Sequence, residues 1–234
     1  MLKSKSALVL IVAASSITAC SSNEIGNSKD VAQDKIYQHY SFSYNEGDAN
    51  AELYCQFRFA GKNGTTLVLN SPAGVQFDGS NLPVDSSKYG GAYYRKYVEA
   101  NKIYGSHSIV FNTIENKKLE NSFSFEHFTL TGVPAAAAKS KPLVINFETA
   151  ALKDNDYIEL STNNSDSSFT VTHTASDKGN FITVPAKELQ RQKGKVLELS
   201  ATLYRTIPLQ QNTSEGGDIS VRHTLKTVNL PLTQ

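Results

Sequence analysis

The chain has 234 residues, and its 23 Lys and Arg against 22 Asp and Glu give a formal net charge of +1 at pH 7. A balance this even argues against nucleic acid or an anionic membrane surface as the partner, because both require a clustered positive excess. The length suffices for one large domain or two small ones.

The first 19 residues have the features of an export signal. Lys3 and Lys5 precede an apolar run over residues 7–14, which gives way to small residues, and a signal peptide has these parts in this order. The run is shorter than the roughly 20 apolar residues that a transmembrane helix requires. We therefore expect cleavage on export; the alternative is an ordinary buried N-terminal helix.

The end of this segment reads Ile17-Thr18-Ala19-Cys20, which resembles the lipobox of bacterial lipoproteins. The resemblance covers the first 20 residues. It implies cleavage before Cys20, a diacylglycerol thioether and an amide-linked acyl chain on that cysteine, and several acyl chains anchor a protein far better than one. In enterobacterial lipoproteins an Asp after the cysteine favours the inner membrane, whereas Ser21 resembles the outer-membrane pattern. The predicted location is the cell envelope, with the lipid on Cys20 in the outer membrane.

Residues 20–35 follow as the lipidated cysteine and a predicted flexible tether. Ser, Asn, Asp, Lys and Gln dominate this segment, and so polar a composition does not offset the entropy of ordering a chain. With Cys20 acylated, Cys55 is the remaining cysteine, so no intramolecular disulfide is expected. Cys55 shares the parity of Leu53 and Phe57, which predicts a buried thiol.

From residue 36 onward, apolar residues recur with a period of two, which predicts half-buried strands separated by Gly- and Asn-rich turns. An alanine run between Pro134 and Pro142 interrupts this pattern and lacks side chains large enough for a core. We therefore predict domain 1 over 36–132, a linker over 133–142 and domain 2 over 143–234. The expected strands are 36–44, 53–59, 66–69, 75–77, 93–98, 107–111, 123–130, 143–147, 157–160, 169–173, 181–184, 196–205 and 219–230.

Each half contains a helical turn before a strand. Residues 185–189 precede the strand at 196–205, and residues 97–101 precede the strand at 107–111. This order resembles the E-to-F crossover of immunoglobulin-like sandwiches, in architecture only, because the hallmark disulfide and Trp are missing. The predicted fold is all-β, with two tandem immunoglobulin-like β-sandwich domains after a flexible lipid-anchored tether. A single sandwich of about 200 residues is the alternative.

No catalytic or metal-binding motif is recognisable in the sequence. The five histidines lack the short spacing of metal ligands, and the Asp- and Asn-rich stretches at 45–50 and 154–156 lack the EF-hand spacing. A nucleophile elbow, a phosphate-binding glycine loop and a Cys-x-x-Cys pair are also missing. We therefore predict no catalytic residue, no metal and no cofactor, although a Ser-His-Asp site assembled from distant strands would not be visible in a sequence.

The most distinctive composition is the tyrosine-rich stretch 89–97. Tyr93, Arg95 and Tyr97 should share one face of a strand and Tyr94 the other. Tyr and Arg are enriched at interface hot spots, so Tyr93, Tyr94, Arg95 and Tyr97 are the predicted partner-binding residues. Alternatively, these tyrosines cover a sandwich edge with their hydroxyls in water.

These observations predict a lipid-anchored envelope protein that acts as a non-enzymatic binding, adhesion or assembly module. Its partners would be the membrane, through the lipid on Cys20, and an envelope or surface protein, with no role for nucleic acid. Fold alone supports such a role only by association. A periplasmic enzyme or inhibitor with a site scattered over loops, and a structural spacer, are the alternatives.

Overall fold

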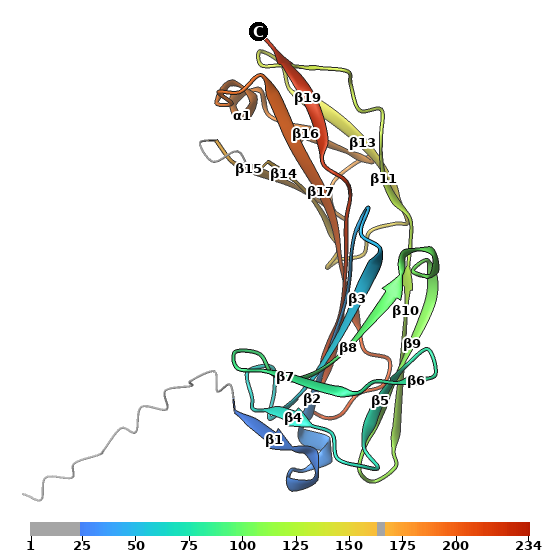
Figure 1. Ribbon diagram of the computed structural model, residues 1–234. Helices are drawn as coiled ribbons and strands as arrows, with labels where there is room; N and C mark the ends of the chain where they lie inside the picture. Colours follow the sequence, from blue (N-terminus) through green and yellow to red (C-terminus); the bar gives the residue numbers. More distant parts are fainter. Residues whose placement is uncertain (1–23, 163–166) are drawn as a thin grey trace, which may run out of the picture.

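The computed structural model describes residues 24–162 and 167–234. The predicted signal peptide and Cys20 lie outside the described residues. Strands make up 57% of the chain and helices 7%, which confirms the predicted all-β class. The folded part is a crescent, whose hollow side lies to the left in Figure 1. No helix in residues 24–162 or 167–234 is long and apolar enough to cross a membrane.

The crescent has two lobes, each built around its own hydrophobic core. The first lobe contains β1 (Ile25–Asn27), β2 (Ile36–Asn45), β3 (Asn50–Phe59), β4 (Thr66–Val68), β5 (Gly74–Phe77), β6 (Ser80–Asn81), β7 (Val84–Ser87), β8 (Gly91–Glu99), β9 (Gly105–Asn112), β10 (Lys118–Phe125) and β18 (Gly217–Thr224). The second contains β11 (Phe128–Thr131), β12 (Ala137–Ala138), β13 (Leu143–Thr149), β14 (Tyr157–Thr162), β15 (Phe169–Thr174), β16 (Phe181–Val184), α1 (Ala186–Gln190) and β19 (Val228–Thr233), and β17 (Val196–Pro208) runs through both. Single 3₁₀ turns occupy Ser28–Asp30, Gln33–Lys35 and Ala100–Lys102.

Both cores lie between two sheets, as expected for sandwiches. One sheet of 12 strands runs the length of the molecule in the order β1-β4-β3-β2-β18-β17-β14-β15, with β7, β8, β12 and β19 joined to it. The smaller sheets β10-β9-β5-β6 and β11-β13-β16 cover the first and second cores. Alternate residues of the strands, such as Phe42, Phe57 and Phe111 in the first core and Leu160 and Leu199 in the second, point inward.

The two lobes share the large sheet because of β17 and β18. β17 pairs with β14 of the second lobe and with β18, and β18 in turn pairs in parallel with β2 from the start of the chain. Ile219 and Val221 of β18 therefore belong to the first core. The run predicted at 123–130 is divided between β10 and β11, and the run predicted at 219–230 is divided between β18 and β19.

The cores divide the chain differently from the predicted boundary at 133–142. Phe128, which precedes the predicted linker, lies in the second core. Within the linker itself, Ala137 is buried and β12 pairs in parallel with β19. The small alanine side chains let this segment pack closely against its neighbours, so the segment is part of the second lobe.

The prediction of a flexible tether is wrong for residues 24–35. β1 pairs in parallel with β4, and Ser28 and Gln33 are buried. The Gln33 amide donates to the Ser28 carbonyl at 2.6 Å and accepts from the Ile114 N–H at 3.1 Å. These hydrogen bonds satisfy the buried polar groups, so the segment folds despite its few apolar side chains.

Cys55 of β3 is completely buried, as its parity predicted. Burial raises the pKa of its thiol, because desolvation disfavours the thiolate. The side chain therefore acts as a small core residue and not as a nucleophile.

Candidate binding surface

The four predicted partner-binding residues of β8 do not lie together on one surface. Tyr94 is 3% exposed, its ring packs edge-on against Phe57, and its hydroxyl accepts from the Leu69 N–H at 2.7 Å. This tyrosine is a core residue of the first lobe. Tyr97, by contrast, is 59% exposed.

Tyr93 lies on the outer face of the sheet and is nevertheless 7% exposed. Its ring stacks on Tyr54 with centroids 5.3 Å apart, and the Arg95 guanidinium lies 4.9 Å from its centroid on the same face. Its hydroxyl donates to Asp85 at 2.9 Å, and this hydrogen bond raises the pKa of Tyr93. Neighbouring side chains therefore bury Tyr93 without a second sheet above it.

Arg95 holds the outer side of β8 in a fixed arrangement. Its Nε lies 2.8 Å from Glu52 Oε1, and its Nη1 donates to the Tyr97 hydroxyl at 3.1 Å. The guanidinium thus bridges neighbouring residues of β3 and β8 and restricts the rotamers of both. Tyr93, Arg95 and Tyr97 form one surface cluster with Glu52 and Tyr54.

This cluster is one end of a row of cross-strand neighbours that crosses both lobes. Residues directly opposite each other in a sheet share a face. Following the register from strand to strand gives a row of six side chains on the outer face: Tyr157, Tyr204, Arg222, Ser43, Glu52 and Tyr97. The pairing of β18 with β2 joins the two halves of this row.

Three further contacts order the same face. Tyr157 and Tyr204 stack with centroids 4.6 Å apart at an interplanar angle of 18°. Tyr37 donates to Asp218 at 2.7 Å, and His39 Nδ1 lies 3.2 Å from the same carboxylate. Burial opposes ionisation of Asp218, but the hydrogen bonds from His39 and Tyr37 prevail and lower its pKa. Burial and the Asp218 contact raise the pKa of Tyr37 to about 12.

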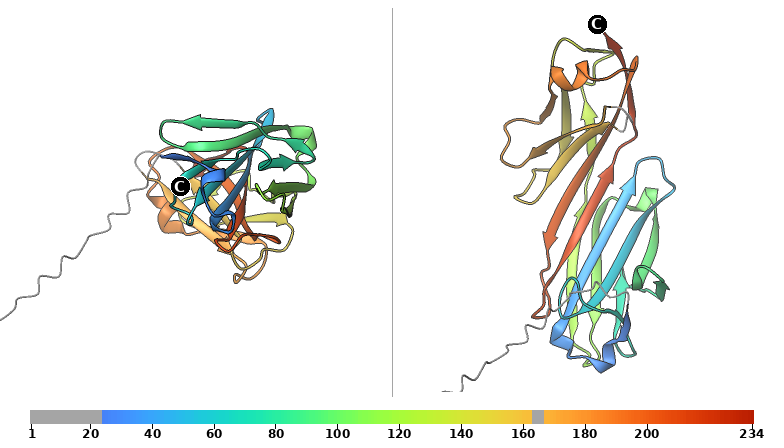
Figure 2. Two further views of the ribbon diagram at one scale, coloured as in Figure 1. Left: turned by 90° about the horizontal axis from the view of Figure 1, so that it is seen from below. Right: turned by 90° about the vertical axis from the view of Figure 1, so that its left-hand side faces the viewer.

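The outer face of the large sheet forms the hollow side of the crescent, while the two smaller sheets pack on the opposite side (Figures 1 and 2). We call this surface the concave face. It includes the outward-facing residues Tyr37, His39, Ser41, Ser43, Glu52, Tyr54, Gln56, Arg58, Asp85, Tyr93, Arg95, Tyr97, Glu99, Tyr157, Glu159, Ser161, Ser200, Thr202, Tyr204, Thr206, Asp218, Ser220 and Arg222. Tyrosines, small hydroxyl residues, acids and arginines characterise it.

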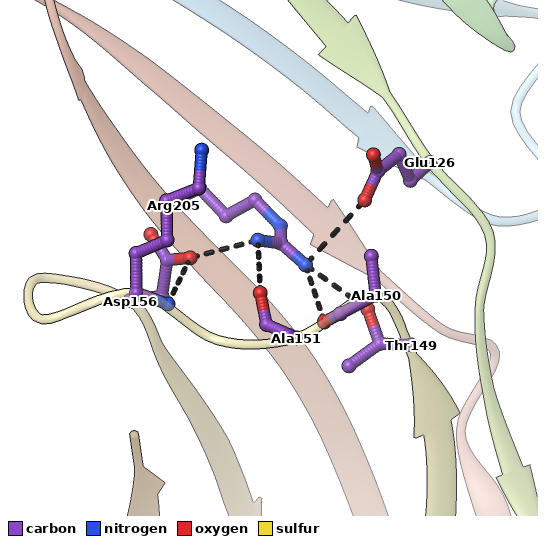
Figure 3. Close-up of polar contacts among 7 residues, drawn as sticks. Glu126, Thr149, Ala150, Ala151, Asp156 and Arg205 are labelled. Atoms are coloured by element: carbon purple, nitrogen blue, oxygen red, sulfur yellow. Dashed lines mark hydrogen bonds and ion pairs between the residues drawn. The ribbon is translucent and has the colours of Figure 1, made fainter. Parts of the chain in front are cut away.

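A buried arginine lies where the two lobes meet (Figure 3). Arg205 of β17 has the inward parity of Leu203, and its guanidinium donates to Asp156 Oδ2 at 2.7 Å and to the Ala150 carbonyl at 2.9 Å. It also lies 3.7 Å from Glu126, which directly follows β10 of the first lobe. Asp156 is itself 3% exposed. Arg205 thus connects the 150–156 loop of the second lobe to the first.

The sequence contains a signal for this junction. Leu197, Leu199, Ala201 and Leu203 alternate as inward apolar residues, and Arg205 continues their parity. A charged residue on an otherwise apolar face must find a partner when it is buried. The identity of that partner could not be read from the sequence, because Asp156 lies about 50 residues away in the chain.

A pocket of about 370 Å³ near the end of β15 contains two titratable side chains, His173 and Asp177. His173 is 6% exposed and packs edge-on against Phe147. The Thr174 N–H donates to the Asp177 carboxylate, and this hydrogen bond lowers the pKa of Asp177. Within the part of the chain that the structure describes, no hydroxyl or thiol bonds to the His173 ring, and no three metal-ligating side chains converge.

No family model and no curated protein matches this sequence. Among solved structures, the chain is similar to a titin fragment at 12% identity and a TM-score of 0.24, with 84% of this chain and 65% of that fragment covered. Murine CEACAM1b gives 9% identity and a TM-score of 0.27, with coverage of 85% and 100%. The first two immunoglobulin domains of DIP-gamma give 12% identity and a TM-score of 0.22, with coverage of 85% and 95%.

Proposed function

We propose that this chain is a lipid-anchored envelope protein whose concave face binds a folded protein partner. The observation that carries the proposal is the uninterrupted cross-strand row from Tyr157 to Tyr97, which crosses both lobes. A spacer would have no need of a continuous tyrosine-rich surface over both of its halves.

The composition of the concave face favours a protein as the partner. Tyrosine supplies a large contact area at a low entropic cost, and Ser and small polar groups supply adaptable hydrogen bonds, as in antibody paratopes. The face is also ordered before binding, because the Arg95–Glu52 pair and the Tyr157–Tyr204 stack fix its side chains. Preorganisation of this kind improves affinity. Acids and arginines both lie on this face, which favours a partner whose contact surface also carries charges of both signs.

Two exposed residues of the row test the binding surface. In the chain without residues 1–19 and with Cys20→Ser, we expect Tyr97→Ala and Arg222→Ala each to reduce capture of an envelope protein by roughly thirtyfold, the effect of a hot-spot residue worth about 2 kcal/mol. Melting temperatures should hardly change, because both side chains are exposed. Affinity capture from envelope extracts, followed by titration of the captured protein, gives the measurement.

Arg191→Ala is the matched control, since Arg191 is an exposed arginine outside the concave face. It should bind like the parent protein. If Tyr97→Ala and Arg222→Ala retain full capture, or if Arg191→Ala loses as much, the concave face is not the binding surface.

The lipid anchor is tested separately in the exporting bacterium. We expect Cys20→Ala to abolish acylation and to release the protein from the membrane fraction, because acyl chains on Cys20 are the proposed attachment. Metabolic labelling with a palmitate analogue and fractionation after a high-salt wash measure the two effects. A variant that stays in the washed membrane pellet would exclude lipidation of Cys20 as the anchor.

A further inference from the structure

The large sheet ends at β15, whose far edge is open. Among the described residues β15 pairs with β14 alone. Thr170 and Thr172 are exposed, and the strand contains no Lys, Asp, Glu or Pro. Edge strands are commonly protected by charges, prolines or bulges, and the central part of β15 has none of these.

Hydrogen-bonded and non-hydrogen-bonded residue pairs alternate along the strands of the sheet, and this alternation shows which backbone groups of β15 face the open edge. The Leu225 N–H donates to the Ala201 carbonyl, which identifies the hydrogen-bonded pairs between β17 and β18. Successive residues of an antiparallel strand point their amides alternately to either side. When this alternation is followed from β17 through β14 to β15, the amides of Val171 and His173 point toward β14. The N–H and C=O groups of Thr170 and Thr172 point outward.

A side chain already occupies the outward amide at one end of β15, and a second side-chain bond lies just before the strand. At one end the Thr174 N–H donates to Asp177 Oδ2 at 2.8 Å, in agreement with the outward phase. Just before the strand, the Gln192 amide donates to the carbonyl of Ser167 at 2.6 Å. Within β15, the outward backbone groups that no side chain occupies are therefore those of Thr170 and Thr172, on either side of Val171.

We propose that β15 pairs antiparallel with β15 of a second copy of this chain, with Val171 opposite Val171 on the two-fold axis. Thr170 then faces Thr172 of the second copy, and each of these two pairs exchanges both of its N–H···O bonds. This register uses the two free residues and leaves the Thr174–Asp177 bond intact. A register centred on Thr172 would instead require the occupied Thr174 amide.

The chemistry of the strand favours its own copy as the occupant. Thr170 and Thr172 are uncharged, so no like charges oppose each other across the axis, and opposed threonines on neighbouring strands stabilise a sheet. The axis of such a pair is perpendicular to the sheet, so both concave faces point to the same side. The inference concerns the edge and stands independently of what the concave face binds.

A contact limited to one short strand is smaller than a standard interface of roughly 1,600 Å². We therefore expect weak association in solution, with a dissociation constant on the order of 0.1–1 mM. Attachment of the chains to one membrane would raise their effective concentration, as a linker does.

Cysteine cross-linking tests the pairing and its register. The protein used lacks residues 1–19 and carries Cys20→Ser, and its remaining native cysteine, Cys55, is buried. Opposed residues of a non-hydrogen-bonded pair have Cα atoms about 4.5 Å apart, within the range for a disulfide. We expect Val171→Cys to give a disulfide dimer under mild oxidation. Thr174→Cys should not, since its two copies would lie roughly 20 Å apart. Ser86→Cys, on the exposed edge strand β7, controls for random collision.

Sedimentation at about 1 mM protein, near the expected dissociation constant, tests the same contact without cysteines. Thr172→Pro removes an outward N–H and leaves the bonds to β14 in place, a position where an edge strand tolerates proline. We expect dimers of the parent chain and at least tenfold weaker association of Thr172→Pro with little change in melting temperature. A parent chain that stays monomeric, a Thr172→Pro variant that dimerises equally, or cross-linking at Ser86 as fast as at Val171 would each overturn the proposal.

Discussion

Replacement of Arg205 by alanine is expected to lower the free energy of unfolding by about 3–5 kcal/mol, the range found when one partner of a buried ion pair is removed. The variant leaves the Asp156 carboxylate buried without its partner at 2.7 Å, and it also removes the donor to the Ala150 carbonyl. Equilibrium denaturation followed by circular dichroism measures the change.

Arg222→Ala is the control for this prediction, because Arg222 is the exposed neighbour of Tyr204 on the adjacent strand. Its loss should change stability by no more than about 0.5 kcal/mol. A loss of less than about 1 kcal/mol for Arg205→Ala, well below the range for a broken buried pair, would mean that Asp156 finds water or another partner and that the junction does not depend on this arginine.

Tyr94→Ala is expected to destabilise the protein by about 3–5 kcal/mol, as does the truncation of a buried aromatic side chain to alanine. The ring of Tyr94 fills space beside Phe57, and its hydroxyl accepts the Leu69 N–H. Tyr97→Ala, three residues away on the same strand, should be nearly neutral because its side chain is mostly exposed.

Melting curves of the two variants measured side by side decide whether β8 is oriented as described. Equal losses would contradict the assignment of Tyr94 to the core and Tyr97 to the surface. Tyr94→Phe is a useful third variant, since it keeps the ring and removes the hydroxyl. It should cost about 1–3 kcal/mol, the penalty for leaving the buried Leu69 N–H unsatisfied.

The amino-acid sequence alone determined the all-β class and most of the strands, because alternation with a period of two is a local property of the chain. The same alternation placed Cys55 in the core. It could not decide between the two faces of β8, where Tyr93 and Tyr94 are both buried but for different reasons. Tyr94 points into the core, whereas Tyr93 is covered by the side chains of Tyr54 and Arg95, which come together only in the folded sheet.

Tertiary structure also decided how the halves of the chain combine. The pairing of β18 with β2 joins residues about 180 positions apart, and no local pattern encodes it. The same is true of the partners of Arg205 and of the hydrogen bonds that fold residues 24–35 onto the first lobe. The polar composition of residues 20–35 suggested a tether, and the alanine–proline run suggested a linker. Both predictions rested on composition, which shows only how many apolar side chains a segment has to bury. Backbone pairing and buried hydrogen bonds, which order both segments, depend on residues distant in sequence.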